Sequence, residues 1–310
     1  MRFSEIPGNQ EIKTKLIQSV KTGRVSHAQL FTGEDGSSSF PLARAYAQYI
    51  SCQNKTEDSC GSCSSCVKFE KMVHPDVHWV FPVTTGRITH PTSDCFINEF
   101  RDLFLKNPYS TENQWYTHLG TDNKQGFISA AEAAEVTKKT SLKTYEGGCK
   151  IVLIWHAEKM HKATANKLLK QIEEPPEKTI FILLTSQQEQ LLPTILSRLQ
   201  ITKIRPLLDV EMRDFLEDKN SDLEVIKQAV QLSMGNISEA LLILEGDEVY
   251  KENTKRFQQW MRLSYQANIF KLTDWVEEIC KIGREQQKNF LQHALHIVRE
   301  SLVFNFASKE

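Results

Sequence analysis

The sequence has 310 residues, of which 40% are hydrophobic and 25% are charged, as in a folded protein large enough for two or three domains. Its formal net charge of −1 excludes a global basic field for nucleic acid, so any DNA contact must come from a local patch or from partners. The apolar runs are too short for a membrane span, and the first residues lack the apolar segment of a signal peptide. These features predict a cytoplasmic protein that makes no membrane contact.

Strand and helix patterns alternate through the first two-thirds of the chain. The expected strands are 27–33, 76–82, 150–157, 179–186 and 202–206, with a helix at 42–51 after the first. The third and fourth are near-continuous apolar runs, which are typical of strands buried on both faces. Between them Ala165, Leu168, Leu169 and Ile172 have amphipathic helical spacing, which Pro175 ends. The pattern predicts a mostly parallel five-stranded sheet with helices on both faces.

Residues 84–126 interrupt this alternation, because they are polar and turn-rich with some aromatic side chains. They are predicted to form an insertion with one or two helices. After residue 206 the strand signal disappears. The expected helices are 210–217, 223–232, 237–244, 257–265, 272–282 and 287–304. Three parts follow: a core at 1–206, a small helical domain at 207–246 and a helical segment at 247–310.

The turn between the first strand and its helix, Gly33–Phe40, partly matches a phosphate loop. That motif reads G-x-x-x-x-G-K-[ST]; its backbone amides and lysine hold phosphates, and its hydroxyl binds Mg²⁺. Alignment on Gly33 and Gly36 puts Ser39 and Phe40 at the lysine and hydroxyl positions. Taken alone, the stretch is equally a serine-rich turn. Its place between a strand and a helix favours a nucleotide site that has lost its chemistry.

The third strand provides an independent test of nucleotide chemistry. A Walker B segment has four apolar residues followed by Asp and Glu, which hold Mg²⁺ and polarise water. Here Trp155 and His156 follow the apolar run, or His156 and Ala157 in a one-residue shift, so neither register supplies the acidic pair. Glu158 is either a displaced acid or, as we prefer, a solvated carboxylate at the start of a helix. We expect a retained fold without hydrolysis.

Four of the seven cysteines, Cys52, Cys60, Cys63 and Cys66, lie within fifteen residues. In a reducing compartment such clustering indicates a metal site rather than disulfides. Four thiolates complete the tetrahedral shell of Zn²⁺, so the metal would be structural. An iron–sulfur cluster and four free thiols are the alternatives, although exposed thiols would oxidise. A finger that reads DNA is disfavoured because Lys55 and Lys68 are the only basic residues between Cys52 and Glu70.

One long segment then gives a family resemblance. Residues 164–198, TANKLLKQIEEPPEKTIFILLTSQQEQLLPTILSR, closely resemble the central block of bacterial clamp-loader subunits, with its N-x-L-L-K-x-[IL]-E-E-P-P signature and terminal S-R-C. HAQLFTG, LARAYAQYISC and the HPDV stretch at 74–77 are also similar, and the resemblance extends over about residues 1–245. It implies an AAA+ core with a P-loop NTPase-like sheet and a small zinc module at 52–66. A helical lid at 207–246 and a collar segment from 247, shorter than usual in the family, would follow.

Two kinds of clamp-loader subunit carry the zinc module: one hydrolyses ATP, and the other keeps the serine–arginine motif without a working phosphate loop. The losses above favour the non-hydrolysing kind. So does Ser238, which replaces the arginine of the family's G-x-x-R-x-A-L sensor. The resemblance implies zinc at the four cysteines, no ATP binding, and Ser197–Arg198 as an arginine finger for a neighbouring subunit. By position alone Arg198 is equally a helix cap or a surface ion-pair partner.

The implied partners are ATP-hydrolysing clamp-loader subunits and a delta subunit, with the sliding clamp and primed DNA reached through their complex. The chain would then serve DNA replication within the DNA polymerase III holoenzyme, at the cytoplasmic replisome on the nucleoid. Two other functions are considered. One is an ATP-hydrolysing subunit of the gamma/tau kind with an atypical phosphate loop. The other is a zinc-dependent DNA-binding protein unrelated to ring assemblies.

Overall fold

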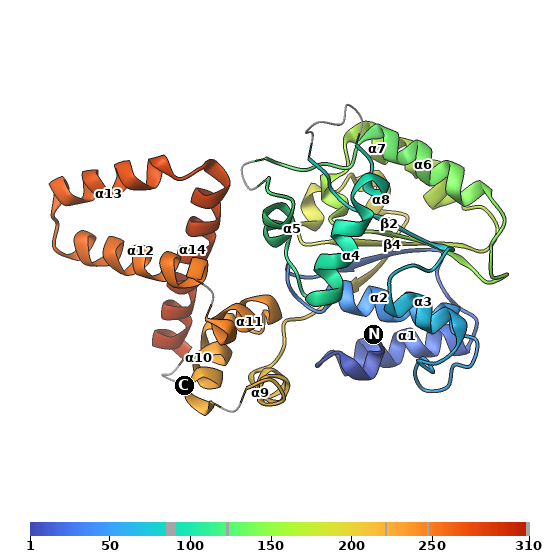
Figure 1. The fold of residues 1–310 in the computed structure, drawn as a ribbon, viewed down its shortest axis with the longest axis horizontal. Coiled ribbons are helices and arrows are strands. Elements are labelled where there is room, and N and C mark those ends of the chain that lie inside the picture. The colour runs from blue at the N-terminus through green and yellow to red at the C-terminus, as the bar shows by residue number, and fades with distance from the viewer. Residues whose placement is uncertain (85–90, 122–123, 221, 247, 308–310) are drawn as a thin grey trace. The chain divides into compact units, whose positions relative to one another are not determined.

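The computed structural model describes residues 1–84, 91–121, 124–220, 222–246 and 248–307. The chain divides into two compact units, Met1–Leu119 with Gln125–Leu208, and Gly120–Lys124 with Asp209–Glu310. The first contains the sheet and the second is helical (Figure 1). Within the described residues, no helix combines the length and apolar character needed to cross a membrane.

Five parallel strands form the sheet of the first unit. They are β1 (Ala28–Thr32), β2 (Val77–Val80), β3 (Lys150–Ile154), β4 (Thr179–Thr185) and β5 (Gln200–Lys203), in the order β2-β3-β4-β1-β5. Because β1 pairs with β4 and β5, the loop after β1 emerges beside the carboxyl ends of its neighbours, where ligands bind in open α/β sheets. The predicted parallel five-stranded sheet is confirmed. The fifth strand begins two residues earlier than expected, because this edge strand is mostly exposed and gives little apolar signal.

Helices cover both faces of the sheet, as predicted (Figure 1). One face carries α1 (Gln10–Lys21), α2 (Ser39–Ser51), α3 (Ser64–Glu70), α4 (Ile97–Lys106) and α5 (Glu112–His118), and the other carries α6 (Ala130–Ser141), α7 (Lys162–Glu173) and α8 (Pro193–Leu196). Along β3, Ile151 and Leu153 enter the first core while Val152 and Ile154 enter the second. Apolar residues are therefore needed at each of the four positions from Ile151 to Ile154.

The described part of the predicted insertion lies in the core rather than at the periphery. Phe100, Phe104 and Trp115, from α4 and α5, are fully buried. The Phe100 ring stacks on Phe81 at 3.9 Å between centroids, and the Trp115 indole N–H donates to the Pro82 carbonyl at 2.8 Å. One or two helices were predicted here and two are present, but their buried side chains complete one face of the sheet. Residues 85–90 and 122–123 lie outside the described residues.

Gly126 is required by the packing of the Tyr116 ring. A Cβ atom built at Gly126 would lie 2.5 Å from the Tyr116 hydroxyl oxygen and 2.7 Å from its ring carbon Cε1. Because that ring is buried, it cannot move away cheaply. We expect Gly126→Ala to reduce the free energy of unfolding by about 1–3 kcal/mol, measured by urea denaturation. Gly148→Ala is the matched control, because a Cβ there meets no atom within 4 Å; equal midpoints for the two variants would contradict the packing argument.

Among the described residues of the second unit, the regular elements are all helices. They are α9 (Asp209–Glu217), α10 (Leu223–Ser233), α11 (Ile237–Glu245), α12 (Glu248–Tyr265), α13 (Ile269–Lys281) and α14 (Arg284–Ala307). The last three enclose an aromatic cluster in which Trp260 stacks on Trp275 at 5.5 Å, beside Phe290. The division of this helical part into a lid and a collar segment near residue 247 remains a prediction.

Candidate functional site

The phosphate-loop segment forms a tight turn between β1 and α2. The hydroxyl oxygens of Ser37 and Ser39 lie 2.8 Å apart, and a Cβ atom on Gly33 would come within 2.4 Å of the Ser39 hydroxyl. The hollow that this loop lines with Tyr109 and His156 has a cavity volume of ≈ 20 Å³. Such a volume holds about one water molecule. The loop is therefore folded on itself around its own serine hydroxyls.

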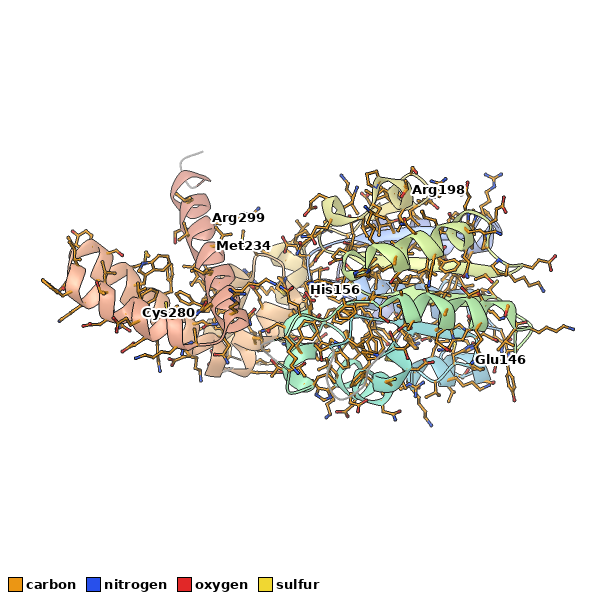
Figure 2. The ribbon with its side chains drawn as sticks, turned by 90° about the horizontal axis from the view of Figure 1, so that it is seen from above. Glu146, His156, Arg198, Met234, Cys280 and Arg299 are labelled. Atoms are coloured by element: carbon orange, nitrogen blue, oxygen red, sulfur yellow. The ribbon has the colours of Figure 1, made fainter. Side chains whose placement is uncertain are left out.

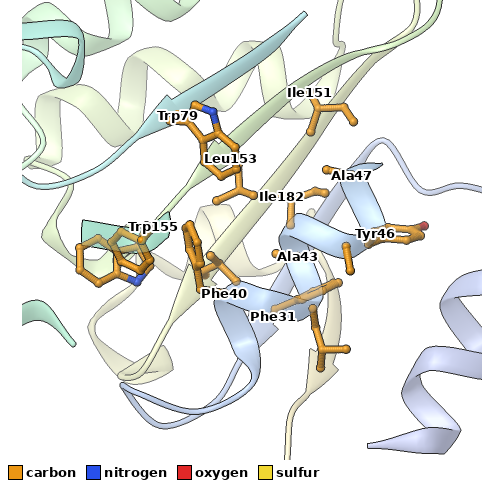
Figure 3. Close-up of a cluster of buried hydrophobic side chains, with 14 of the residues drawn as sticks. Phe31, Phe40, Ala43, Tyr46, Ala47, Trp79, Ile151, Leu153, Trp155 and Ile182 are labelled. Atoms are coloured by element: carbon orange, nitrogen blue, oxygen red, sulfur yellow. The ribbon is translucent and has the colours of Figure 1, made fainter. Parts of the chain in front are cut away.

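Aromatic packing occupies the two positions that would hold the Mg²⁺ ligands of a working site. Phe40, at the position of the loop hydroxyl, is 4% exposed and packs against Phe104 with a centroid distance of 4.2 Å. Trp155, at the first acidic position after β3, is also 4% exposed and meets the Phe40 ring edge-on at 6.5 Å. Figure 3 shows these two side chains next to each other in the apolar cluster. Both side chains belong to the buried hydrophobic cluster on this face of the sheet.

Next to this aromatic contact, His156 lies between two carboxylates. Its Nε2 atom is 3.2 Å from Oδ1 of Asp35, in the phosphate loop, and its Nδ1 atom is 2.9 Å from Oε1 of Glu158. His156 has left-handed backbone angles, φ 53° and ψ 59°, which are uncommon for a residue with a Cβ atom. The chain thus turns sharply after β3 and directs the imidazole between its two partners.

The imidazole and the carboxylates each stabilise the charged form of the other. Burial alone would lower the pKa of His156, but the charges and hydrogen bonds of Asp35 and Glu158 raise it well above its usual 6.5. Burial alone would raise the pKa of Glu158, but the hydrogen bond and charge of His156 lower it to about 2. The His156 ring is therefore a positively charged imidazolium at neutral pH, while the Glu158 carboxylate is ionised.

Sequence reasoning singled out the loop at Gly33–Phe40 but missed this ion-pair group. The expectation of a solvated Glu158 was wrong: its side chain is 0% exposed and accepts a hydrogen bond from the Ser186 hydroxyl at 3.1 Å. Asp35 occupied a variable position of the motif and carried no signal. Ala157, the other residue considered for the acidic pair, is buried in the opposite core.

The four clustered cysteines converge as expected. Their sulfur atoms all lie within 4.8 Å of one another, and each is buried or half-buried. Cys52 follows α2, Cys60 lies in the loop, Cys63 is the N-cap of α3, and Cys66 lies in the first turn of that helix. A tetrahedral Zn²⁺ with Zn–S bonds of ~2.3 Å would place the sulfurs about 3.8 Å apart, a small contraction from this arrangement.

Hydrogen bonds from backbone N–H groups lower the pKa of two of the thiols, Cys60 and Cys63. The N–H of Cys63 donates to the Cys60 sulfur at 3.3 Å, and such bonds lower the pKa of Cys60 to about 6. Burial would raise the pKa of Cys63, but N–H donors including that of Cys66 lower it overall. Burial raises the pKa of Cys52 and of Cys66. A bound metal would hold all four as thiolates, so the donor set fits zinc.

The cysteine loop is tied to the rest of the first unit. The Asp58 carboxylate accepts hydrogen bonds from the backbone N–H groups of Phe3 at 3.2 Å and Ser4 at 2.9 Å. On α3, Lys68 pairs with Glu146, which precedes β3. The cluster is therefore an integral part of this unit.

Arg198 lies at the surface, after α8 and before β5. One terminal nitrogen donates to the Thr194 carbonyl at 2.8 Å, and Nε is 3.1 Å from a carboxylate oxygen of Glu173 in α7. Its neighbour Leu199, where the family has cysteine, is buried in the core beneath. Figure 2 labels Arg198 and His156 at separate places in the sheet-containing unit. The guanidinium thus has local partners in this chain, and Ser197 supplies another at 3.3 Å.

The sensor position contributes no charge. Ser238, at the second residue of α11, is fully buried among the helices of the second unit. The side chain is uncharged and has no reach to a phosphate comparable to that of an arginine.

These features define a class of protein: an α/β protein with a five-stranded parallel sheet, in which an aromatic contact and a buried ion-pair group lie after β1 and β3. A family model described as "DNA polymerase III, delta subunit" matches residues 8–208. The chain therefore belongs to this family.

Relatives of the chain include subunits of DNA polymerase III. It is 28% identical to the "DNA polymerase III subunit delta'" of Bacillus subtilis over 240 residues, 77% of this chain and 60% of the relative. The delta' subunit of Escherichia coli is 28% identical over 75% of this chain and 59% of its own length. The gamma/tau subunit of Mycobacterium tuberculosis is 28% identical over 69% of this chain and 30% of its own. The matched region thus spans about 60% of the delta' relatives.

Proposed function

We propose that the chain is a non-hydrolysing delta-prime subunit of a DNA polymerase III clamp loader. The observation that carries the proposal is the Phe40–Trp155 contact at the two positions where a working site would hold its metal ligands. Phosphoryl transfer depends on charges that stabilise the transferring group, and the lysine, hydroxyl and acidic pair are all absent. The delta-prime relatives support the same role.

In this role the chain would assemble with ATP-hydrolysing clamp-loader subunits and a delta subunit in the cytoplasm. The complex would load the sliding clamp onto primed DNA during replication. The near-neutral net charge agrees with DNA being reached through the complex rather than by this chain alone. The helical second unit would contain the lid and a collar segment.

We also propose that the four-cysteine cluster holds one structural Zn²⁺. Cys52, Cys60, Cys63 and Cys66 would supply all four ligands, which leaves no open coordination position for chemistry. The metal would fix the loop between α2 and α3.

The third part of the proposal concerns Ser197 and Arg198. Arg198 would leave Glu173 and act as an arginine finger on ATP bound by a neighbouring subunit. An exposed ion pair contributes only about 0–1 kcal/mol, so its release opposes this movement weakly. A planar guanidinium can donate two hydrogen bonds to phosphate oxygens.

Isothermal titration tests the absence of nucleotide binding. We expect the isolated chain to show no heat of binding with ATP and Mg²⁺ at micromolar to near-millimolar concentrations, because no lysine or arginine is among the residues that line the hollow at the loop. An ATP-hydrolysing clamp-loader subunit, titrated under the same conditions, is the positive control. A dissociation constant in the micromolar range would contradict the proposal.

A gamma/tau kind of ATPase with an atypical loop is the second candidate, because the gamma/tau relative is as similar in identity as the delta-prime relatives. It predicts both nucleotide binding and slow hydrolysis by the isolated chain. Release of phosphate from ATP, measured beside the titration, separates the two candidates.

A further inference from the structure

The imidazole of His156 occupies a position that requires two hydrogens on its ring. Both ring nitrogens face carboxylate oxygens, of Asp35 at 3.2 Å and of Glu158 at 2.9 Å. An ionised carboxylate only accepts hydrogen bonds, and a neutral imidazole has a single N–H to donate. With both carboxylates ionised, the two contacts are satisfied together only by the imidazolium form.

The two carboxylates extend this contact to other parts of the site. The second oxygen of Asp35 accepts the backbone N–H of Glu112, at the start of α5, at 2.7 Å. The bonded oxygen of Glu158 also accepts the Ser186 hydroxyl, just after β4, at 3.1 Å. One cation thus joins the phosphate loop, the end of β3, the end of β4 and α5.

We propose that His156, as an imidazolium, is the internal cation that holds the phosphate loop closed in place of a nucleotide and its metal. In a working site the loop is organised around bound phosphates and Mg²⁺. Here Asp35 of the loop turns toward a fixed positive charge of the protein itself. The role does not depend on the assembly in which the chain works.

The ion-pair group also opposes phosphate binding. Asp35, Glu158 and the His156 imidazolium together carry one net negative charge at the place where a triphosphate would bind. The side chains of His156 and Glu158 are 4% and 0% exposed, so solvent screens their charges weakly, whereas Asp35 is 28% exposed. This negative charge would oppose nucleotide binding in addition to the effect of the missing lysine.

The pH dependence of this contact has a definite sign. The pKa of His156 is raised on folding, so its stabilisation is complete below about 6.5 and is lost as the pH rises through the higher folded value. The pKa of Glu158 is lowered, so its stabilisation is present above about 4.5 and is lost as the pH falls toward 2. The other groups nearby are Glu112, which pairs with Lys159, and the Tyr116 hydroxyl, which donates to Glu112.

The test uses the full chain and two measurements. Nitrogen-15 NMR of His156 should show both ring nitrogens protonated at pH 7. Hydrogen exchange should show protection of the amides of residues 34–39 and of Glu112. In His156→Asn this protection should fall at least about tenfold, because two buried ionic contacts are lost. Asparagine tolerates the left-handed backbone, so the substitution removes the charge without adding strain there.

His161→Asn is the matched control, since His161 is exposed; protection of the loop should be unchanged in it. Asp35→Asn provides a second variant, which keeps an oxygen for the Glu112 amide but removes the charge facing His156. It should loosen the loop and move the pKa of His156 down. A ring with one protonated nitrogen at pH 7 would overturn the proposal. So would unchanged loop protection in folded His156→Asn or Asp35→Asn.

Discussion

Cys63→Ser should abolish stoichiometric zinc binding while the sheet stays folded. The wild-type chain, purified in reductant, is expected to contain about one zinc per molecule, following the four-ligand count. Serine leaves three sulfur ligands, which hold the metal far less tightly. Because Cys63 is also the N-cap of α3 and serine is a favourable N-cap, this substitution removes the metal ligand but keeps the helix cap. Elemental analysis and circular dichroism measure the two effects.

Loss of the metal should loosen residues 52–66 and lower the melting temperature by several degrees, since about 1 kcal/mol corresponds to ~2–4 °C in a domain of this size. Cys95→Ser is the control, because Cys95 is exposed and outside the cluster; it should keep both metal and stability. A metal-free wild-type protein that is equally stable with a chelator would refute the zinc proposal. Iron in place of zinc would show that the four cysteines hold an iron–sulfur cluster instead.

The sheet was predictable because burial on both faces leaves an apolar run that few other structures share. The runs at 150–157 and 179–186 are of this kind, and β3 and β4 lie within them. Helices whose buried faces contain few large apolar residues gave little helical periodicity in the sequence and were missed. Helix α6 is an example, since its buried residues include Ala133, Thr140 and Glu132 rather than large apolar side chains.

The candidate site also has features that the local sequence reveals and features that it does not. The absent lysine, hydroxyl and acidic pair are local facts of the sequence, as is the cysteine spacing. What replaced them depends on contacts between distant residues: Asp35 and His156 are 121 positions apart, and Phe40 meets aromatic residues from the segment predicted as an insertion. A pairing of this range has no periodicity to reveal it, because only the folded sheet brings the two loops together. Aromatic residues in a polar segment were the one available signal that 84–126 joins the core.

Arg198→Ala should lower the clamp- and DNA-stimulated ATPase of a reconstituted complex while leaving folding, zinc content and assembly intact. An arginine finger can be worth ~10³–10⁵ in rate in GTPases, but a loader has several ATP sites, so the total loss should be much smaller. Arg198→Lys should restore little, since an ammonium cannot reproduce two parallel hydrogen bonds to phosphate. Arg24→Ala, at another exposed arginine of the same unit, is the control for a general loss of surface charge.

Glu173→Ala separates the finger from a structural role of Arg198. In the chain by itself the guanidinium pairs with Glu173 and the Thr194 carbonyl, so a fall in ATPase with Arg198→Ala could in principle reflect the loss of this pair. If the pair were what mattered, Glu173→Ala would reproduce the defect. If Arg198 instead donates to a neighbour's phosphate, removal of Glu173 frees it, and ATPase should stay within about twofold of wild type because exposed ion pairs contribute so little. Equal defects in the two variants, or wild-type activity in a correctly assembled Arg198→Ala complex, would rule out the finger.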